Sequence, residues 1–253
     1  MLSVICPIYN EAKYIDVCVQ SILLQDYPKQ QLEVLFVDGM SKDGTRDIVN
    51  NYSKQYPFIR LLNNEKRIVP VAMNIGIKAS IGDIVMRLDA HAQYPPNYFS
   101  VLVKELVRLR ADNVGVACKT DVLNKTSKTL AIREVLSNRF GVGNSTFRLG
   151  VDKVIEVDTV PFGCWKKDVF NKYGFYDERL IRNQDIELNK RIVRGGGHIF
   201  IVPDTYCTYL ARETFDGLAK NNFGNGKWNI LTVYYTKQFK SLSVRHFIPL
   251  LFL

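Results

Sequence analysis

The sequence predicts an α/β fold with a mostly parallel central sheet flanked by helices. Its first 90 residues contain four short apolar runs with β-branched residues, separated by segments with helical periodicity. The runs begin about 25–30 residues apart, which leaves room for a crossover helix in each connection between parallel strands. In sheets of this kind, ligands bind beyond the carboxyl ends of the strands.

The elements of the first half follow in order from these patterns. Ile15, Val19 and Ile22 recur on one side of the first expected helix. Asp43 is expected to cap the second helix. Pro70 opens the third helix, in a first-turn position where an N–H group is not needed. The expected strands span residues 3–6, 33–37, 58–62 and 83–88, and the expected helices span 11–24, 43–52 and 70–79.

The second half is less regular and has more turn residues. Asn183 is expected to cap a helix at 184–194, which the glycines at 195–197 end. A glycine-rich loop is expected at 141–150. The other expected elements are strands at 114–120, 158–164 and 198–202, and helices at 127–140, from 166 and, as several amphipathic helices, over 213–239.

Composition and charge narrow the classes of function. The 253 residues carry a formal net charge of +9, which suits an anionic small molecule, an anionic membrane surface or simply a basic soluble surface. The chain has no dense block of lysines and arginines, so no nucleic-acid partner is expected. The five cysteines are odd in number and include no CxxC pair, which argues against a zinc ribbon and indicates a reducing, cytoplasmic setting. The first residues lack the basic leader of a signal peptide.

The segment from Arg87 to His91 places two metal-binding side chains at the end of an expected strand. Asp89 and His91 are two residues apart, and together they can bind a divalent cation that holds phosphates. Taken alone, an aspartate at a strand end is more often a turn or cap residue. Tyr9 and Asp38 follow two neighbouring strands, however, so one edge of the sheet is expected to gather all these side chains.

Six segments along the chain form a more specific pattern together. They are VICPIYNE at 4–11, VDGMSKDGT at 37–45, AMNIG at 72–76, DAH at 89–91, QD at 184–185 and NGKW at 225–228. With these motifs the chain resembles the family-2 glycosyltransferases, which have the GT-A fold, over residues 3–228. The variants at 89–91 and 225–228 are most similar to bacterial succinoglycan-type exopolysaccharide glycosyltransferases.

The resemblance implies a domain organisation and a reaction. A GT-A domain is expected at 1–240, with a nucleotide-binding half at 1–120, an acceptor-binding half at 121–240 and, at 241–253, a basic and apolar tail that could begin a membrane segment. The implied enzyme inverts the anomeric carbon as it moves a sugar from a UDP-sugar to a saccharide or lipid-linked saccharide. It would act in surface or exopolysaccharide synthesis at the cytoplasmic face of the bacterial cell membrane.

The resemblance also assigns the donor site. Asp38 would accept a hydrogen bond from the N3–H group of uracil. Asp89 would bind a divalent metal, Mn²⁺ or Mg²⁺. His91, where the family has a second aspartate, would be the other ligand or would donate a hydrogen bond to a phosphate. Imidazole favours Mn²⁺ over Mg²⁺. Lys66 or Arg67 could reach a phosphate or lie in a solvated loop. The remaining nucleotide-binding residues would be Pro7, Tyr9, Glu11 and Asn74.

On the acceptor side, the resemblance makes Asp185 the general base. It falls in the first turn of an expected helix, where a negative charge is favoured, and a merely structural N-terminal acid is the alternative. Glu187 lies on another face of that helix and is the weaker candidate. The residues expected to bind the acceptor are Phe162, Gly163, Gln184 and Trp228.

Two other functions stay open at this point. Because His91 and Gln184 depart from the family motifs, a degenerate transferase could bind nucleotide without turnover. A sugar-1-phosphate nucleotidyltransferase shares the layout of the first half, but it should begin with a glycine-rich, basic phosphate loop. The chain has Pro-Ile-Tyr-Asn-Glu at that place.

Overall fold

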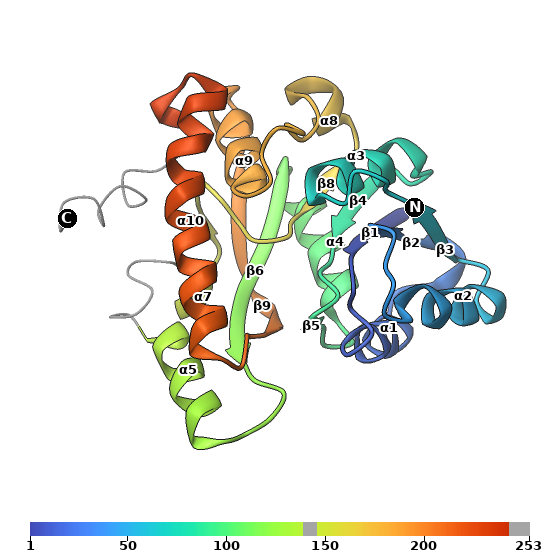
Figure 1. The fold of residues 1–253 in the computed structure, drawn as a ribbon. Helices are drawn as coiled ribbons and strands as arrows, with labels where there is room; N and C mark the ends of the chain where they lie inside the picture. Colours follow the sequence, from blue (N-terminus) through green and yellow to red (C-terminus); the bar gives the residue numbers. More distant parts are fainter. Residues whose placement is uncertain (139–145, 243–253) are drawn as a thin grey trace.

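The computed structural model describes residues 1–138 and 146–242, and in this part of the chain all strands belong to one sheet (Figure 1). The strand order is β3-β2-β1-β4-β8-β6-β9-β5, and β7 pairs with β9 outside this path. The strands are β1 (Leu2–Ile8), β2 (Leu32–Asp38), β3 (Ile59–Asn63), β4 (Ile84–Arg87), β5 (Ala92–Gln93), β6 (Asn113–Asp121), β7 (Ile155–Glu156), β8 (Cys164–Lys166) and β9 (Ile199–Leu210).

Helices connect these strands and cover the sheet. They are α1 (Ile15–Leu23), α2 (Thr45–Gln55), α3 (Val69–Ala79), α4 (Tyr98–Arg108), α5 (Ser127–Ser137), α7 (Thr146–Leu149), α8 (Asp168–Tyr173), α9 (Gln184–Arg194) and α10 (Phe215–Thr236), with short 3₁₀ turns at Lys29–Gln31 and Phe239–Ser241. Figure 1 shows α10 as the longest helix, on the side of the molecule that holds β6 and β9.

The first half of the sheet is parallel, as predicted. Strand β1 pairs in parallel with both β2 and β4, and β2 pairs in parallel with β3. Ile8 stands opposite Asp38, which stands opposite Asn63, so these strands end level with one another. The loops that follow β1 and β2 therefore begin side by side at one edge of the sheet.

Both faces of this parallel part are buried. Alternate residues of a strand point to opposite faces, so Val4 and Cys6 join a hydrophobic cluster with α1 and α4. Ile5 joins the opposite cluster with Met73 of α3 and Leu188 of α9. Burial on both faces explains why the strands are nearly continuous apolar runs rather than alternating ones.

The second half joins the first through antiparallel pairs. The short strand β8 lies between β4 and β6 and is antiparallel to both. Strand β9 runs parallel to β6, with a change of register between Val116 and Ala117, and β5 adds an antiparallel strand to it. This arrangement carries the end of β9 to the segment that contains His91, where the Leu210 N–H group donates to the His91 carbonyl at 3.0 Å.

The structure differs from the predicted elements at several places. Helix α4 was not predicted, although its apolar residues recur with helical spacing. The strand predicted at 158–164 is absent, because the chain turns there through Phe162 and Gly163, both of which have positive φ angles. The several helices predicted over 213–239 are the single helix α10, because its glycines at positions 217, 224 and 226 do not interrupt it.

Parts of three predictions lie outside the described residues. These parts are residues 139–140 of the predicted helix, 141–145 of the predicted loop and 243–253 of the predicted tail. The loop prediction fails for 146–149, which form α7. In residues 1–138 and 146–242, no helix is both long and apolar enough to cross a membrane.

Candidate active site

Hydrogen bonds join the loops after β1 and β2 into one unit. The Asn10 N–H group donates to Ser41 Oγ, and the Glu11 N–H group donates to Thr45 Oγ1, both at 2.8 Å. Asp43 accepts from the Ala12 N–H group at 3.0 Å and from the Thr45 N–H group at 3.1 Å. Gly44 is the capping residue of α2, so Asp43 stabilises the start of this helix from one position earlier.

A pocket opens above these loops and gathers most of the predicted donor site. Its apolar wall is formed by residues such as Ile68 and Ala72, and the exposed ring of Tyr9 stands at its edge. Arg67 faces this pocket, whereas Lys66 pairs with Glu178 at 3.1 Å. The predicted residues that line the pocket are Pro7, Tyr9, Glu11, Asp89 and His91.

Three polar side chains meet at one end of this pocket. His91 Nδ1 lies 3.3 Å from Glu11 Oε1, and His91 Nε2 lies 4.0 Å from Asp89 Oδ2. Burial acts to lower the pKa of His91, but the hydrogen bond with Glu11 and the charge of Asp89 outweigh it, so the pKa is raised. The Tyr209 ring packs edge-on against His91 with centroids 5.2 Å apart, which fixes the imidazole between the two carboxylates.

The donor set fits a cation that is held jointly with a substrate. No three His, Cys, Asp or Glu side chains within residues 1–138 and 146–242 form a group that could hold a metal. Asp89 and His91 nevertheless turn a carboxylate and an imidazole into the same pocket. Mg²⁺ at phosphate-binding sites commonly takes only one or two protein ligands, with phosphates and water filling the other positions. The pair therefore suits a metal that arrives with a diphosphate.

Two predicted donor residues are held by the protein instead. Asp38 is fully buried and accepts hydrogen bonds from Ser41 Oγ and Arg46 Nη1, both at 2.5 Å. For Asp38 to accept a hydrogen bond from uracil, Ser41 or Arg46 would first have to release its carboxylate. The Asn74 side chain donates to the Tyr176 carbonyl and accepts from the Tyr176 N–H group, both at 3.0 Å. It fastens α3 to the segment that leads to α9.

Arg87 is a buried cation next to Asp89 of the donor pocket. The residue is only 6% exposed, its Nη2 atom lies 3.6 Å from Asp89 Oδ1, and its Nε and Nη1 atoms have no hydrogen-bond partner among the described residues. Burial acts to lower the pKa of Arg87, but the charge of Asp89, the Tyr176 hydroxyl group and the charge of Asp185 more than offset this and raise it. Arg87 is thus a buried cation whose nearest carboxylate is Asp89 among the described residues. No role was assigned to Arg87 from the sequence, although a single arginine at the end of an apolar strand could have indicated one.

A groove beside the start of α9 exposes Asp185. Residues 181–186 form one wall, and Asn225 and Asn229 of α10 form the other. Asp185 Oδ1 accepts from the Ile186 N–H group at 2.9 Å, and its second oxygen has no partner in the described chain. Gln184 also lines the groove and is only 7% exposed, yet its Oε1 atom has no hydrogen-bond partner there. The groove therefore offers two oxygens that can accept from hydroxyl groups.

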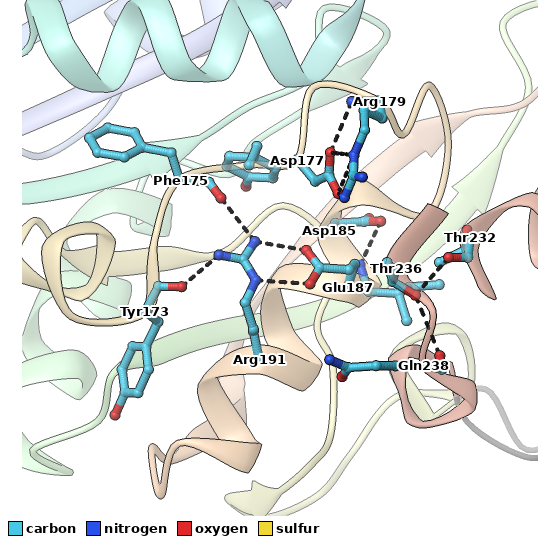
Figure 2. Close-up of polar contacts among 12 residues, drawn as sticks. Tyr173, Phe175, Asp177, Arg179, Asp185, Glu187, Arg191, Thr232, Thr236 and Gln238 are labelled. Atoms are coloured by element: carbon cyan, nitrogen blue, oxygen red, sulfur yellow. Dashed lines mark hydrogen bonds and ion pairs between the residues drawn. The ribbon is translucent and has the colours of Figure 1, made fainter. Parts of the chain in front are cut away.

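Glu187, the weaker candidate for the base, is engaged elsewhere. Figure 2 shows its carboxylate held by Arg191, at 2.8 Å and 2.7 Å, while Asp185 lies outside this ion pair. Arg191 also donates to the carbonyl groups of Tyr173 and Phe175. Glu187 therefore anchors the segment before α9, and each of its oxygens already accepts a hydrogen bond from Arg191.

The other predicted acceptor residues do not line this groove. The Phe162 ring lies 5.8 Å below the Arg87 guanidinium and belongs to the core. Trp228 of α10 is half-buried and stacks on Tyr235 with ring centroids 6.3 Å apart.

Asn183 begins α9 without a side-chain cap and donates to Asn229 Oδ1 at 3.0 Å. The prediction that Asn183 is the capping residue of α9 is confirmed for its position, but its side chain makes no capping hydrogen bond and connects α9 with α10.

Gly163 should not tolerate a side chain. At its φ of +97°, a Cβ atom would lie 2.5 Å from the Trp165 ring and 2.7 Å from Asn113 Oδ1. Gly163→Ala should therefore lower the free energy of unfolding by about 2–4 kcal/mol, which urea titration would measure. Gly196→Ala is the matched control, because that glycine has a φ of +80° with nothing within 4 Å. It should cost about 1–2 kcal/mol, and equal losses in both variants would show that the clash at 163 is relieved.

Comparison with known proteins identifies the family. The profile of glycosyl transferase family 2 matches residues 3–174. The chain belongs to this family. This match confirms the resemblance seen in the sequence and argues against a sugar-1-phosphate nucleotidyltransferase.

Two curated relatives extend over nearly the whole glycosyltransferase chain. The dolichyl N-acetyl-alpha-D-glucosaminyl phosphate 3-beta-D-2,3-diacetamido-2,3-dideoxy-beta-D-glucuronosyltransferase of Methanococcus voltae is 28% identical over 230 residues, which cover 89% of this chain and 71% of the relative. The succinoglycan biosynthesis protein ExoA of Rhizobium meliloti is 29% identical over 236 residues, which cover 88% of this chain and 67% of the relative.

Solved structures confirm the predicted GT-A fold. Residues 1–349 of S. aureus TarS in complex with UDP-GlcNAc superpose with a TM-score of 0.65 at 19% identity, over 84% of this chain and 59% of that one. GalNAc-T7 with UDP, GalNAc and Mn²⁺ also gives a TM-score of 0.65, at 18% identity, over 84% of this chain and 44% of that one. The glycosyltransferase thus spans about half the length of these solved chains.

Proposed function

We propose that this glycosyltransferase is metal-dependent and inverting, and that it moves a sugar from a UDP-sugar to a saccharide or lipid-linked saccharide during surface or exopolysaccharide synthesis. The observation that carries the proposal is the donor pocket, which Asp89 and His91 line together with Tyr9 and Glu11, and where the buried Arg87 lies 3.6 Å from Asp89. Relatives named for a dolichyl-linked acceptor and for succinoglycan synthesis support the acceptor class.

Asp185 would be the general base. Its unengaged oxygen would take the proton of the acceptor hydroxyl as the hydroxyl oxygen attacks the anomeric carbon. The start of α9 favours a negative charge at this position. No second unengaged carboxylate accompanies Asp185 in the lining of the groove, so a single displacement, which inverts the anomeric carbon, fits better than a covalent intermediate.

Asp89 and His91 would hold the divalent metal against the donor diphosphate. When bound, the metal would stabilise the negative charge that develops on the leaving diphosphate. Glu11 orients the His91 ring through its Nδ1 atom, which leaves Nε2 toward Asp89. Arg67, in the same pocket, could approach the phosphates. A net charge of +9 is compatible with a peripheral location at the cytoplasmic face of the membrane.

The proposal predicts selective, metal-dependent nucleotide binding. In calorimetric titrations of UDP, GDP, ADP and dTDP with and without Mn²⁺, UDP should bind tightly and only with the metal. Asp89 and His91 give the reason for metal dependence. Asp38, once released by Arg46, would favour bases with an N3–H group, uracil and thymine, so dTDP should bind nearest to UDP. Equal binding of all four nucleotides would contradict the role of Asp38. If none binds, a degenerate transferase becomes the better interpretation.

A further inference from the structure

Helix α10 packs on the protein along one side, and the described residues leave its outer side uncovered. On the inner side, Asn221 and Asn225 accept hydrogen bonds from Arg182 Nη1 at 2.9 Å and 2.7 Å. Asn229 accepts one from Asn183 at 3.0 Å. The three asparagines are four residues apart, so they share the face of α10 that is held against the protein.

The opposite face of α10 carries large apolar side chains that are exposed. Phe223, Ile230 and Tyr234 are 77%, 57% and 61% exposed. An α-helix turns about 100° per residue, so these three side chains share one face, about 160° away from the asparagines. Single exposed apolar residues are normal on a protein surface, but a row of them over about three turns of one helix indicates a binding face.

Lysines alternate with these apolar side chains along the same face. Lys227 lies between the first two of them, and Lys237 follows the last turn, with its Nζ atom 4.2 Å from the centre of the Tyr234 ring. In the described part of the chain, no carboxylate forms an ion pair with either lysine. Lys220, in contrast, is paired with Asp216 at 2.8 Å. The face therefore combines exposed apolar side chains with two positive charges that no carboxylate compensates.

This combination is complementary to an anionic lipid surface. Helices that lie in a membrane interface carry basic residues together with aromatic and aliphatic ones. The lysine ammonium groups would meet the lipid phosphates, while the apolar side chains between them would enter the boundary of the acyl chains. The net charge of +9 would draw the whole chain toward the same surface.

The exposed face has a fixed relation to the candidate active site. Asn225 and Asn229, on the other side of the same helix, form one wall of the groove that exposes Asp185. An α-helix with its side chains is about 10–12 Å in diameter. A membrane against the outer face would therefore lie within about one helix diameter of the groove.

We propose that the outer face of α10, formed by Phe223, Lys227, Ile230, Tyr234 and Lys237, binds an anionic membrane surface with the helix axis parallel to the bilayer. This inference rests on the peripheral location in the proposed function and adds the surface that meets the membrane. The alternative occupant of such a face is a second copy of the chain, and the experiment separates the two.

The test measures binding of the full chain to sucrose-loaded vesicles by sedimentation. Vesicles of phosphatidylcholine alone are compared with vesicles of phosphatidylcholine and phosphatidylglycerol in equal parts. The wild type should bind the anionic vesicles about tenfold or more tightly, and added salt should weaken this preference. Lys227→Gln combined with Lys237→Gln should lower the affinity for anionic vesicles about 10- to 30-fold, since each basic residue near such a surface contributes about fivefold. Phe223→Ser combined with Ile230→Ser should lower it about tenfold or more.

Matched substitutions elsewhere separate this face from general charge and hydrophobicity. Figure 1 shows α2 on the opposite side of the molecule from α10. Lys54→Gln on α2 and Leu24→Gln, at an exposed position after α1, remove the same kinds of side chain. They should change vesicle binding by less than about twofold. All these positions are exposed, so UDP affinity with Mn²⁺ should match that of the wild type in every variant.

Three outcomes would overturn the proposal. Equal affinity of the α10 variants and the wild type for anionic vesicles would do so and leave the peripheral location intact. If the wild type binds neither kind of vesicle, the peripheral location fails as well, and the UDP titration decides separately whether the transferase function holds. A wild-type dimer without vesicles that dissociates on Phe223→Ser and Ile230→Ser, measured by analytical ultracentrifugation, would assign the face to a second copy instead.

Discussion

Asp185→Asn should reduce turnover at least a hundredfold while UDP affinity with Mn²⁺ changes by no more than a few-fold. The amide can still accept from the Ile186 N–H group through its oxygen, so the local structure should survive. It cannot take the proton of the acceptor hydroxyl, and positioned general bases usually contribute about 10²–10⁴-fold. Steady-state turnover with a UDP-sugar, together with calorimetric titration of UDP, would measure both quantities.

Glu187→Gln is the matched control for this experiment. Glu187 lies in the same first turn of α9, but both its oxygens are bound by Arg191, as Figure 2 shows. Its substitution should lower the melting temperature, because Arg191 would lose its charged partner, and turnover below that temperature should persist. Full activity in Asp185→Asn would mean that another group is the base. Steady turnover that Asp185→Asn abolishes would rule out a degenerate transferase.

The sequence predicted the first half of the fold well for a physical reason. Parallel strands buried on both faces must be continuous apolar runs, and each of the four runs became a strand within one or two residues. The false strand at 158–164 is also apolar and β-branched, but the positive φ of Phe162 and Gly163 turns the chain there. Apolar character shows that a segment is buried and does not show which backbone conformation it has.

The candidate site was also predicted only in part from the sequence. Strand ends locate Pro7, Tyr9, Glu11, Asp89 and His91, because parallel strands that end level bring their loops together.

Other site features needed the tertiary structure. Asn74 is bound by Tyr176, which lies far away in the chain. Asp38 is bound by Arg46, whose side-chain rotamer no local pattern specifies. Asn221, Asn225 and Asn229 have helical spacing in the sequence. Only the tertiary structure shows that α10 packs beside Arg182, which donates to Asn221 and Asn225.

Asp89→Asn should abolish the gain in UDP affinity that Mn²⁺ provides, a loss of at least about a hundredfold. Removing a hydrogen-bond partner of a metal ligand already costs about 10–100-fold, so weakening a direct ligand should cost more. Asparagine is preferred to alanine here because Asp89 also faces Arg87 at 3.6 Å, and a truncated side chain would leave this buried cation with less compensation. Calorimetric titration of UDP with and without Mn²⁺ isolates the contribution of the metal.

The metal-free titration decides between the two roles of Asp89. If Asp89 acts as a metal ligand, UDP affinity without Mn²⁺ should be the same in the variant and the wild type. If it acts mainly by neutralising Arg87, metal-free affinity should rise, because the released guanidinium would attract the diphosphate, and the melting temperature should fall. An unchanged gain from Mn²⁺ would remove Asp89 from the metal site. His91 would then be the candidate ligand that remains in the pocket, beside Glu11.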